Sequence, residues 1–436
     1  MTSCLGDDNN EDDYIVSTDS QLTDVVLTSS RIPALATTSF TIDQVRSLVY
    51  NHDSLPFGVD TTGVNVKLSY VTGSGFQNFQ TDVDGDTAWI ANGDSVRIAQ
   101  LSRFNIYAPN GNKKEYIFKI NIHQVDPDSM QYSLLSEHEP ILSSGNNKTI
   151  FWGDAFYTYV RESNNEVRAY SAVDLKKWVE ISLIDFPENV ILSSIQITQR
   201  GLVAYTEDGF LCTGHIDQRE IVTPRPMEPL GQKWNTHAFD YPVVSVLGDL
   251  KTPQGEERLS LILNKQGTST FAYLSEGNLY YGEPVPENFP VCNFSVVNNN
   301  QASSITVVES LASVWSTING TYWAHLDNPQ QEYPHDKGGN AFMYAGKLYY
   351  LGGCSSDFTY SRDVYTSSDG GIVWEKMEEK AQPFENYIPR EQASLIVDQK
   401  GIYFYIIGGK NTTINAAGLT DIWRVAVNSQ LFELRK

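Results

Sequence analysis

Short apolar runs separated by turn residues extend along almost the whole chain, and they predict strands rather than helices. In residues 116–122, for example, Tyr116, Phe118, Ile120 and Ile122 alternate with other side chains and share one face. Glycine, proline, asparagine and aspartate stand between the runs, and these residues close turns. The pattern therefore predicts an all-β protein.

Residues 14–127 carry the first group of such strands. A hairpin turn is predicted at 109–112, before the clearest strand of the group. About a hundred residues of short alternating strands favour a small immunoglobulin-like β-sandwich. The strands are expected at 25–27, 64–70, 95–99, 104–107 and 115–125.

Two segments near the end of the chain, 340–377 and 393–434, run in parallel. Each has an apolar strand closing on a glycine pair, Gly352-Gly353 or Gly408-Gly409, followed by a loop. An Asp-apolar-aromatic triplet follows at 363–365 and at 421–423, and eleven residues after its aspartate stands an aromatic, Trp374 or Phe432. Such self-similarity indicates repeated units that bury their faces on one another. The segments resemble blades of a Kelch-type β-propeller.

A serine followed seven residues later by a tryptophan recurs at 171–178, 316–323 and 367–374. The last of these resembles the Asp-box turn of sialidases and related propellers. Gly320 matches Gly371, whereas Ile318 stands in the place of Asp369. We expect the polar side chains to close the turn, the glycine to adopt positive φ and the tryptophan to pack between blades. Asp369 is thus predicted to be a turn residue rather than a catalytic one.

The spacing of these motifs counts the blades. The first two tryptophans stand 145 residues apart, which corresponds to three units of about 50 residues and leaves two blades between them. Residues 204–211 and 272–279 share Ala-Tyr, an acid-Gly turn and a leucine, and they are assigned to those two blades. One strand, 132–135, remains, and it either completes the ring or belongs to a linker, 128–145. The six predicted blades are 146–187, 188–230, 234–290, 291–333, 336–384 and 387–436.

The net charge of the 436-residue chain is −22, from 31 Lys and Arg against 53 Asp and Glu. Nucleic acid is therefore not an expected partner, because phosphate binding needs a basic face. The acidity is concentrated at the start, where residues 1–13 are predicted to be a disordered acidic leader. Seven acidic residues precede the first basic one, Arg31: Asp7, Asp8, Glu11, Asp12, Asp13, Asp19 and Asp24.

Residues 1–6 resemble the end of a bacterial lipoprotein signal, in which small residues precede a lipid-bearing cysteine, here Cys4. The acidic run after it resembles the surface-export signal of Bacteroidetes lipoproteins. Residues 40–59, together with the strand at 115–125, resemble the N-terminal domain of uncharacterised Bacteroidetes envelope lipoproteins that carry a propeller behind it. The resemblance implies a surface-exposed outer-membrane lipoprotein that contacts the membrane only through its lipid anchor. That family has no assigned activity, so the resemblance implies no chemistry.

No cofactor or metal site is predicted. The four cysteines, Cys4, Cys212, Cys292 and Cys354, lack the CxxC spacing of a zinc site, and the seven histidines show no metal-ligand spacing. Apart from Cys4, the cysteines are expected to be buried thiols in strands, with one disulfide left open. Nucleophile-elbow, phosphate-loop and HExxH motifs are also missing from the sequence.

Two further motifs have a functional and a structural interpretation. Residues 31–33 match the Arg-Ile-Pro signature of sialidases, in which arginine holds a carboxylate, but they precede every predicted blade by about a hundred residues. Residues 82–86 resemble the start of a calcium loop, but Gly93 stands where such a loop carries glutamate. A structural interpretation is favoured for both.

The loops that lead into the last two blades carry the candidate binding residues. Propellers bind ligands around the channel on one face, through loops from several blades. These two loops combine carboxylates, cations and aromatics, which suits a polar ligand such as a sugar; the alternative is that they carry only solvated charges. The candidates are Tyr333, His335, Asp336 and Lys337, and Tyr387, Arg390 and Glu391.

Two functional classes follow from these observations. The first is a non-catalytic cell-surface module that binds a glycan or an envelope partner. The second is a glycan-acting enzyme, sialidase-like or of another glycoside-processing kind, which has only analogy of fold behind it. A glycosidase needs two carboxylates about 5 to 9 Å apart, and a sialidase needs three converging arginines, which no spacing here identifies.

Overall fold

The computed structural model shows two compact units, Met1–Pro127 and Asp128–Lys436. It describes residues 17–70, 76–83, 86–90, 95–142, 146–216, 232–299, 303–326, 332–334 and 336–433. Each unit has its own core and is considered by itself. Among the described residues, no helix has the length and apolar character needed to cross a membrane.

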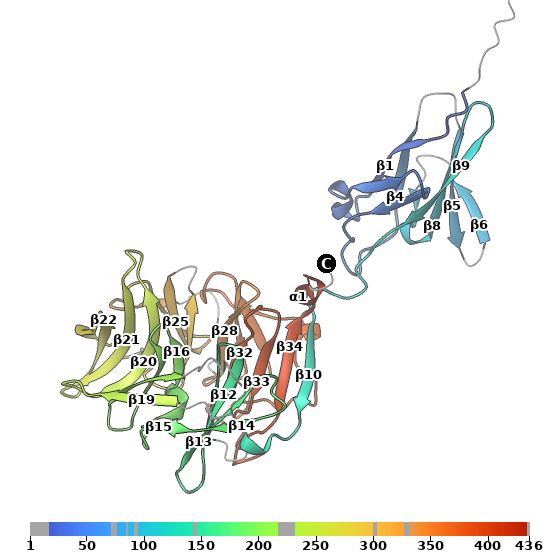
Figure 1. The fold of residues 1–436 in the computed structure, drawn as a ribbon. Coiled ribbons are helices and arrows are strands. Elements are labelled where there is room, and N and C mark those ends of the chain that lie inside the picture. Colours follow the sequence, from blue (N-terminus) through green and yellow to red (C-terminus); the bar gives the residue numbers. More distant parts are fainter. Residues whose placement is uncertain are drawn as a thin grey trace, which may run out of the picture. The chain divides into compact units, whose positions relative to one another are not determined.

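The first unit is a sandwich of two sheets around one hydrophobic core (Figure 1). The smaller sheet has the order β1-β4-β7, and the larger has the order β2-β3-β9-β8-β5-β6. Side chains from both sheets, such as Val66 of β4 and Phe104 of β8, are buried between them. The strands are β1 (Leu22–Thr28), β2 (Phe40–Asp43), β3 (Leu48–Asn51), β4 (Val64–Tyr70), β5 (Phe76–Val83), β6 (Asp86–Ile90), β7 (Ser95–Val96), β8 (Leu101–Tyr107) and β9 (Lys113–Lys119).

The alternation of side chains along β9 agrees with the sequence pattern. Tyr116 and Phe118 are buried, whereas Ile117 between them is 48% exposed. Leu22 donates its N–H to the Tyr116 hydroxyl at 3.0 Å, and this hydroxyl donates to Gln44 at 2.7 Å. The buried tyrosine therefore has partners for its polar end and ties β1 to the opposite sheet.

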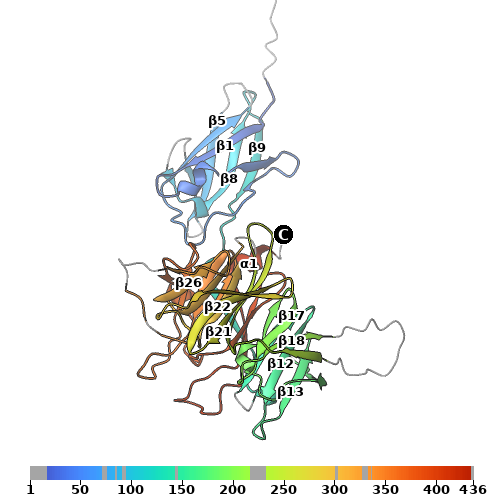
Figure 2. The ribbon, with the colours of Figure 1, turned by 90° about the vertical axis from the view of Figure 1, so that its left-hand side faces the viewer.

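The second unit is a six-bladed β-propeller, in which each blade is an antiparallel sheet with four main strands. The innermost strands are β11, β16, β20, β24, β28 and β32; they follow one another around the ring, and β32 returns to contact β11. Figures 1 and 2 show the propeller in two views, and β16, β20, β28 and β32 are labelled in Figure 1. Blade 1 consists of β11 (Asn147–Trp152), β12 (Ala155–Arg161), β13 (Val167–Ala172) and β14 (Val179–Ile181). Blade 2 consists of β16 (Gln196–Thr198), β17 (Gly201–Tyr205), β18 (Leu211–Ile216) and β19 (Gln232–His237), with β15 (Leu183–Ile184) added beside β19. Blade 3 consists of β20 (Val243–Lys251), β21 (Glu257–Lys265), β22 (Thr268–Ser275) and β23 (Asn278–Pro284). Blade 4 consists of β24 (Ser295–Asn299), β25 (Ser304–Ser310), β26 (Ser313–Thr317) and β27 (Ala324–Leu326). Blade 5 consists of β28 (Asn340–Tyr344), β29 (Lys347–Leu351), β30 (Val364–Ser367) and β31 (Glu375–Lys376). Blade 6 consists of β32 (Ser394–Val397), β33 (Phe404–Ile407), β34 (Ile422–Val427) and β10 (Met130–Ser136).

The last blade takes its outer strand from the beginning of the unit. β10 runs antiparallel to β34, with Met130 opposite Val427, and Figure 1 shows it beside that strand. The strand at 132–135 is therefore the ring-closing strand, and it joins the two ends of the propeller by backbone hydrogen bonds. Because β10 fills the outer position, the chain after β34 forms the short helix α1 (Asn428–Glu433) instead. Phe432 lies in this helix and is not the counterpart of Trp374, contrary to the predicted correspondence.

The recurring tryptophans are wedges between blades. Trp374 is fully buried against Val314 of blade 4, and Trp323 stacks on Phe271 of blade 3 at 5.8 Å. Trp178 packs with Ile407 and Ile422 of blade 6. Each of these indoles adds apolar contact to the joint between neighbouring blades.

The two segments assigned to the middle blades are not equivalent in the structure. Residues 204–211 connect β17 to β18, whereas 272–279 connect β22 to β23, one strand later in the blade. The acid-Gly pair is a general signal for a tight hairpin turn and does not mark a fixed position in a blade. The predicted equivalence of residues 204–211 and 272–279 was therefore wrong by one strand, although the predicted number of six blades is correct.

The ring has two faces, which are distinguished by the direction of the innermost strands. The front face is defined here as the end at which the innermost strands begin, and the back face as the end at which they finish. The front face also carries the loops between the second and third strands of each blade, 352–363 in blade 5 and 408–421 in blade 6. The Ser367–Trp374 turn lies on the back face, because it joins β30 to β31.

Candidate functional site

On the front face, the loops before β28 and β32 are fixed against the long loops of their own blades. Lys337 exchanges two backbone hydrogen bonds with Cys354, and Glu391 exchanges two with Lys410. The N–H of Gly353 also donates to the carbonyl of Arg390, which joins blade 5 to blade 6. The four segments form one surface, which we call the blade 5–6 mouth.

The glycine pair of blade 5 is needed for this close approach. Gly352 and Gly353 have φ of +81° and +105°, a region that side chains disfavour. A Cβ on Gly352 would lie 2.4 Å from the carbonyl oxygen of Arg390. The repeated Gly-Gly of the sequence is therefore a feature of blade packing, and it places the loop of blade 6 against blade 5.

Lys337 and Glu309 form an ion pair at the mouth, with 2.8 Å between Nζ and Oε1. The lysine side chain is 60% exposed, so it retains hydrogen-bond donors that face solvent. Glu309 is the next-to-last residue of the strand β25 of blade 4, and it could not be predicted from the sequence because no repeat motif includes it. An ammonium and a carboxylate are thus presented together on the front face.

Glu391 is the second half-buried carboxylate of the mouth. Burial raises its pKa above the ordinary value for glutamic acid, and the nearby positive charge of Lys410 works in the opposite direction. Its side chain lies over Gly338, where an added Cβ would come within 2.8 Å of Oε2. Glu391 is therefore held in place by the loop of the preceding blade.

Besides burial, the carboxylates Asp336 and Glu391 both raise the pKa of two neighbouring weak acids, the Cys354 thiol and the Tyr350 hydroxyl. Burial raises the pKa of the Cys354 thiol, and the charges of Glu391 and Asp336 raise it further. Burial also raises the pKa of Tyr350, whose hydroxyl donates to the backbone carbonyl of Asp336 at 2.7 Å. Cys354 is consequently a protonated thiol near neutral pH and not an activated nucleophile.

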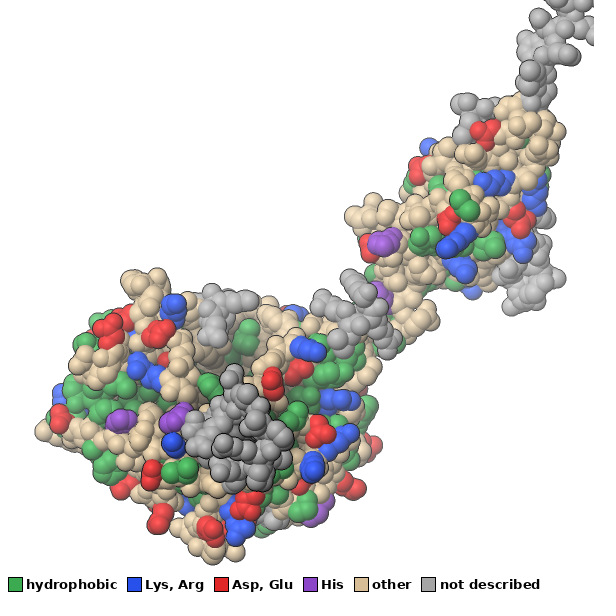
Figure 3. All heavy atoms as spheres, viewed as in Figure 1, with side chains coloured by type: hydrophobic (Ala, Val, Ile, Leu, Met, Phe, Trp, Pro, Cys, Tyr) green, Lys and Arg blue, Asp and Glu red, His purple; other side chains and the backbone are tan. Residues whose placement is uncertain are grey.

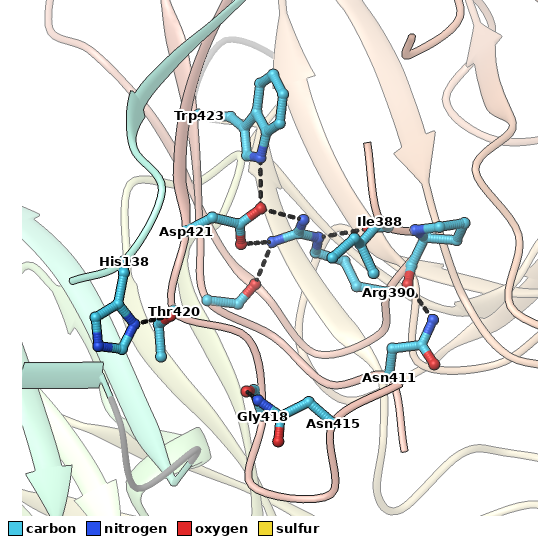
Figure 4. A network of polar contacts seen from close by, with 11 residues as sticks. His138, Ile388, Arg390, Asn411, Asn415, Gly418, Thr420, Asp421 and Trp423 are labelled. Carbon is cyan, nitrogen blue, oxygen red and sulfur yellow. Dashed lines mark hydrogen bonds and ion pairs between the residues drawn. The ribbon is translucent and has the colours of Figure 1, made fainter. Parts of the chain in front are cut away.

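Arg390 corrects one of the predicted roles, because its guanidinium is buried and not presented to a ligand. The side chain is 1% exposed and makes a bidentate pair with Asp421, at 2.5 and 2.8 Å (Figure 4). It also donates to the carbonyls of Gly408 and Ile388, and Trp423 donates its indole N–H to Asp421 at 2.6 Å. The Asp-apolar-aromatic motif at 421–423 thus holds a structural cation in the last blade.

Two tyrosines named from the sequence are also packing residues. Tyr387 is buried, with the guanidinium of Arg390 4.6 Å from its ring centroid and Trp423 against its edge. Tyr333 accepts a hydrogen bond from the backbone N–H of Trp374 at 2.8 Å. Of the seven candidates, the structure therefore brings Asp336, Lys337 and Glu391 together at the mouth. His335 and the lipidation candidate Cys4 lie outside the described residues.

The remaining sequence motifs, at 31–33 and 82–86, and the described cysteines other than Cys354 are not part of the blade 5–6 mouth. Arg31 is on the surface of the sandwich and pairs with Asp60 at 3.4 Å, so it belongs to no blade. Asp82 and Asp86 are in the paired strands β5 and β6. Of the described cysteines, Cys212 is buried in β18, whereas Cys292 and Cys354 are in loops, and all three are free thiols. In the part of the chain that is described, no cluster of His, Cys, Asp and Glu is arranged to hold a metal ion.

The surface of the propeller has a mixed charge pattern. In the view of Figure 3, acidic and basic side chains are interspersed with apolar ones, and no broad basic area is visible on this side. The back face carries a shallow hollow between blades 4 and 5, lined by Ile318, Met343 and Ile372, and by Asp369 of the Ser367–Trp374 turn. This hollow lacks the paired charges of the mouth.

Comparison with known proteins identifies both units. The model of the DUF6242 beta propeller domain matches residues 126–435, and that of the DUF6242 N-terminal domain, a domain of unknown function, matches residues 9–120. No curated protein matches the chain.

The chain is also similar to solved structures. One is described as "Structure of YjhT", with a TM-score of 0.39 and 12% identity over 65% of this chain and 95% of that chain. Another is a selenomethionine-substituted virginiamycin B lyase from Staphylococcus aureus, with a TM-score of 0.37 and 10% identity over 80% of this chain and 94% of that chain.

Proposed function

The chain belongs to the DUF6242 family, and from that premise we propose that it is a non-catalytic binding module of the bacterial cell surface, with the blade 5–6 mouth as its binding site. The ligand proposed is a glycan. An envelope protein is the other partner that this location would offer.

One observation carries the proposal. Exposed Lys337 and half-buried Glu391 stand on neighbouring blades at the front face, where propeller loops converge, and Glu309 and Lys410 accompany them. Sugar hydroxyls both donate and accept hydrogen bonds, so a site with ammonium donors and carboxylate acceptors suits them. The buried Arg390 removes the one arginine that the sequence placed here, and this weakens the sialidase-like alternative.

A glycan-acting enzyme is the second candidate, and Glu391 is the observation in its favour. A carboxyl group whose pKa is raised by burial is suited to donate a proton to a leaving group. A glycosidase also needs a second carboxylate at a defined separation. Asp336, in the loop of the preceding blade, is the candidate for that second carboxylate, because its charge and that of Glu391 both act on Cys354.

The test is a glycan array probed with the purified full chain, followed by product analysis of each bound glycan. We expect retention without turnover, and a Kd weaker by at least about tenfold for Lys337→Ala and for Glu391→Gln, since a hydrogen bond to a charged group contributes about 1.5–3 kcal/mol. The control is Lys251→Ala, an exposed lysine at the end of β20 on the back face. A released sugar product would establish the enzyme instead, and an empty array would overturn both.

A further inference from the structure

Two large apolar side chains are exposed at the tips of the front-face loops of blades 5 and 6. Phe358 is 66% exposed and Ile414 is 60% exposed. Their loops are joined, because the hydroxyls of Tyr360 and Thr412 lie 3.0 Å apart and the N–H of Thr412 donates to Tyr360 at 3.1 Å. The tips therefore form one rigid rim beside the mouth.

The backbone at Phe358 is held in an unfavourable conformation. Its φ is +63°, in the left-handed region that bulky residues rarely adopt. The turn fixes it there, since the N–H of Phe358 donates to the carbonyl of Ser355 at 3.1 Å and the N–H of Ser355 donates to the carbonyl of Thr359 at 2.9 Å. Glycine or asparagine would fit this position better, so the structure tolerates strain to present a phenyl ring to solvent.

The polar side chains around the tips are already engaged within the loops. Asp357 accepts from Ser355 and from the N–H of Thr359, and hydrogen bonds of this kind lower its pKa. Thr413 donates to Asn411, and Asn415 donates to the carbonyl of Gly418 at 2.8 Å. These contacts make the loops rigid before any ligand binds, which lowers the entropic cost of binding. They leave the phenyl ring as the main contact surface of the tip.

The charges below the tips favour an uncharged ligand. Glu309, Asp336 and Glu391 carry carboxylates at the mouth, and Lys337 and Lys410 carry the ammonium groups that face them. Asp357 adds a further carboxylate in the tip itself. Arg362 adds a cation in the loop of blade 5, whereas Arg390 is buried in its pair with Asp421. The four carboxylates named here still outnumber the three cations Lys337, Lys410 and Arg362. A carboxylate on the ligand would therefore meet net repulsion.

We propose that the ligand of the mouth is an uncharged pyranose glycan, one ring of which stacks its apolar face on Phe358 while its hydroxyls reach the charged groups at the foot of the loops. This inference rests on the proposed function and specifies its ligand class. A pyranose has an apolar C–H face and a hydroxyl rim, so it matches an aromatic side chain beside charged hydrogen-bonding groups. Sialylated and uronic-acid glycans are expected to bind more weakly than neutral ones.

The experiment compares Phe358 variants of the full chain on an array of neutral and acidic glycans, followed by titration of the strongest neutral glycan. Phe358→Trp keeps an aromatic face and is expected to stay within about threefold of the wild-type Kd, whereas Phe358→Leu is expected to bind about tenfold more weakly. Phe210→Leu is the matched control, because Phe210 is another exposed phenylalanine, at 38%, in the corresponding loop of blade 2 on the opposite side of the ring. Thermal unfolding of each variant confirms that it is folded.

The outcomes separate this inference from the proposed function. Neutral glycans bound equally by wild type and Phe358→Leu would overturn the stacking role and leave the binding module standing. Acidic glycans as the strongest ligands would overturn the proposed ligand class. An array on which wild type binds nothing would overturn glycan binding itself, and with it the proposed function of the mouth.

Discussion

At the scale of single residues, Arg390 shows how a polar motif can be misread. An arginine in a loop beside a propeller channel indicates a ligand contact, yet here its hydrogen bonds go to Asp421 and to two backbone carbonyls. The partner lies 31 positions later, and its carboxylate is fixed by Trp423. Sequence spacing does not show which of two charged groups is buried, because that depends on how the two loops fold over each other.

Replacing Arg390 by methionine is expected to destabilise the propeller by about 3–5 kcal/mol, because the Asp421 carboxylate would remain buried without its partner. Chemical denaturation monitored by tryptophan fluorescence measures this change. Arg168→Met is the control: Arg168 is an exposed arginine with surface ion pairs at 3.8 Å, and its loss is expected to cost at most about 1 kcal/mol. Equal effects of the two substitutions would contradict the structural role of Arg390.

Glu391 gives a prediction for pH. Its folded-state pKa is raised by burial, so between the ordinary pKa of glutamic acid and the raised value the folded state binds more protons than the unfolded state. Stability from this group therefore falls as pH rises through that window. Glu391→Gln is expected to unfold at a higher temperature than wild type at pH 7 and at nearly the same temperature below pH 4. A difference that is largest in acid would have the wrong sign.

At the scale of elements, the turn that ends in Trp374 explains why an imperfect repeat still works. The Asp369 carboxylate accepts from the N–H groups of Ile372 and Val373, at 3.1 and 3.0 Å. In blade 4 the equivalent position is Ile318, and Asn319 instead accepts from Thr321 and Tyr322, both at 2.9 Å. The polar acceptor has moved by one residue, and the turn is closed in both blades.

This shift makes a paired prediction. Asp369→Ala is expected to lower stability by about 1–2 kcal/mol, the usual cost of losing a side chain that satisfies backbone N–H groups. Ile318→Ala, at the matching position of blade 4, is expected to cost less than about 0.5 kcal/mol, since Ile318 is exposed. The urea midpoint of each variant decides between them, and a larger effect at Ile318 would refute the shifted acceptor.

Strand period, glycine pairs and tryptophan spacing were sufficient to predict an all-β chain with a six-bladed propeller, because these signals are local and repeat along the chain. Only some residues of the proposed front-face site could be named from the sequence. Lys337, Asp336 and Glu391 lie in loops next to a repeat motif, whereas Glu309 lies in a strand that has none. Phe358 lies in the loop between the Gly352-Gly353 pair and the triplet at 363–365, and neither motif marks it as a binding residue. The role proposed for Glu309 and Phe358 depends on the way blades 4, 5 and 6 meet, and this is set by contacts between residues distant in sequence.

At the scale of the whole molecule, β10 links the organisation of the chain to the stability of the ring. The propeller is closed by hydrogen bonds between its first strand, β10, and its last, β34, so β34 is paired on both sides and is not left as an open sheet edge. The chain enters the propeller through β10, directly after the unit that ends at Pro127. An anchor on the first unit would therefore be linked through the backbone to β10, the closing strand of the ring.

Cys4 precedes the strands of the first unit in the sequence, and we propose that it is lipid-modified. An acyl chain contributes about 0.8 kcal/mol per buried CH₂ to membrane binding, so losing the modified cysteine is expected to release the protein. In bacteria with an outer membrane that express the full precursor, Cys4→Ala should move the protein from the membrane fraction to the soluble fraction. Cys292→Ala, which removes an exposed thiol of the propeller, should leave it in the membrane fraction. Membrane association that survives Cys4→Ala would show that lipidation of this residue is not the anchor.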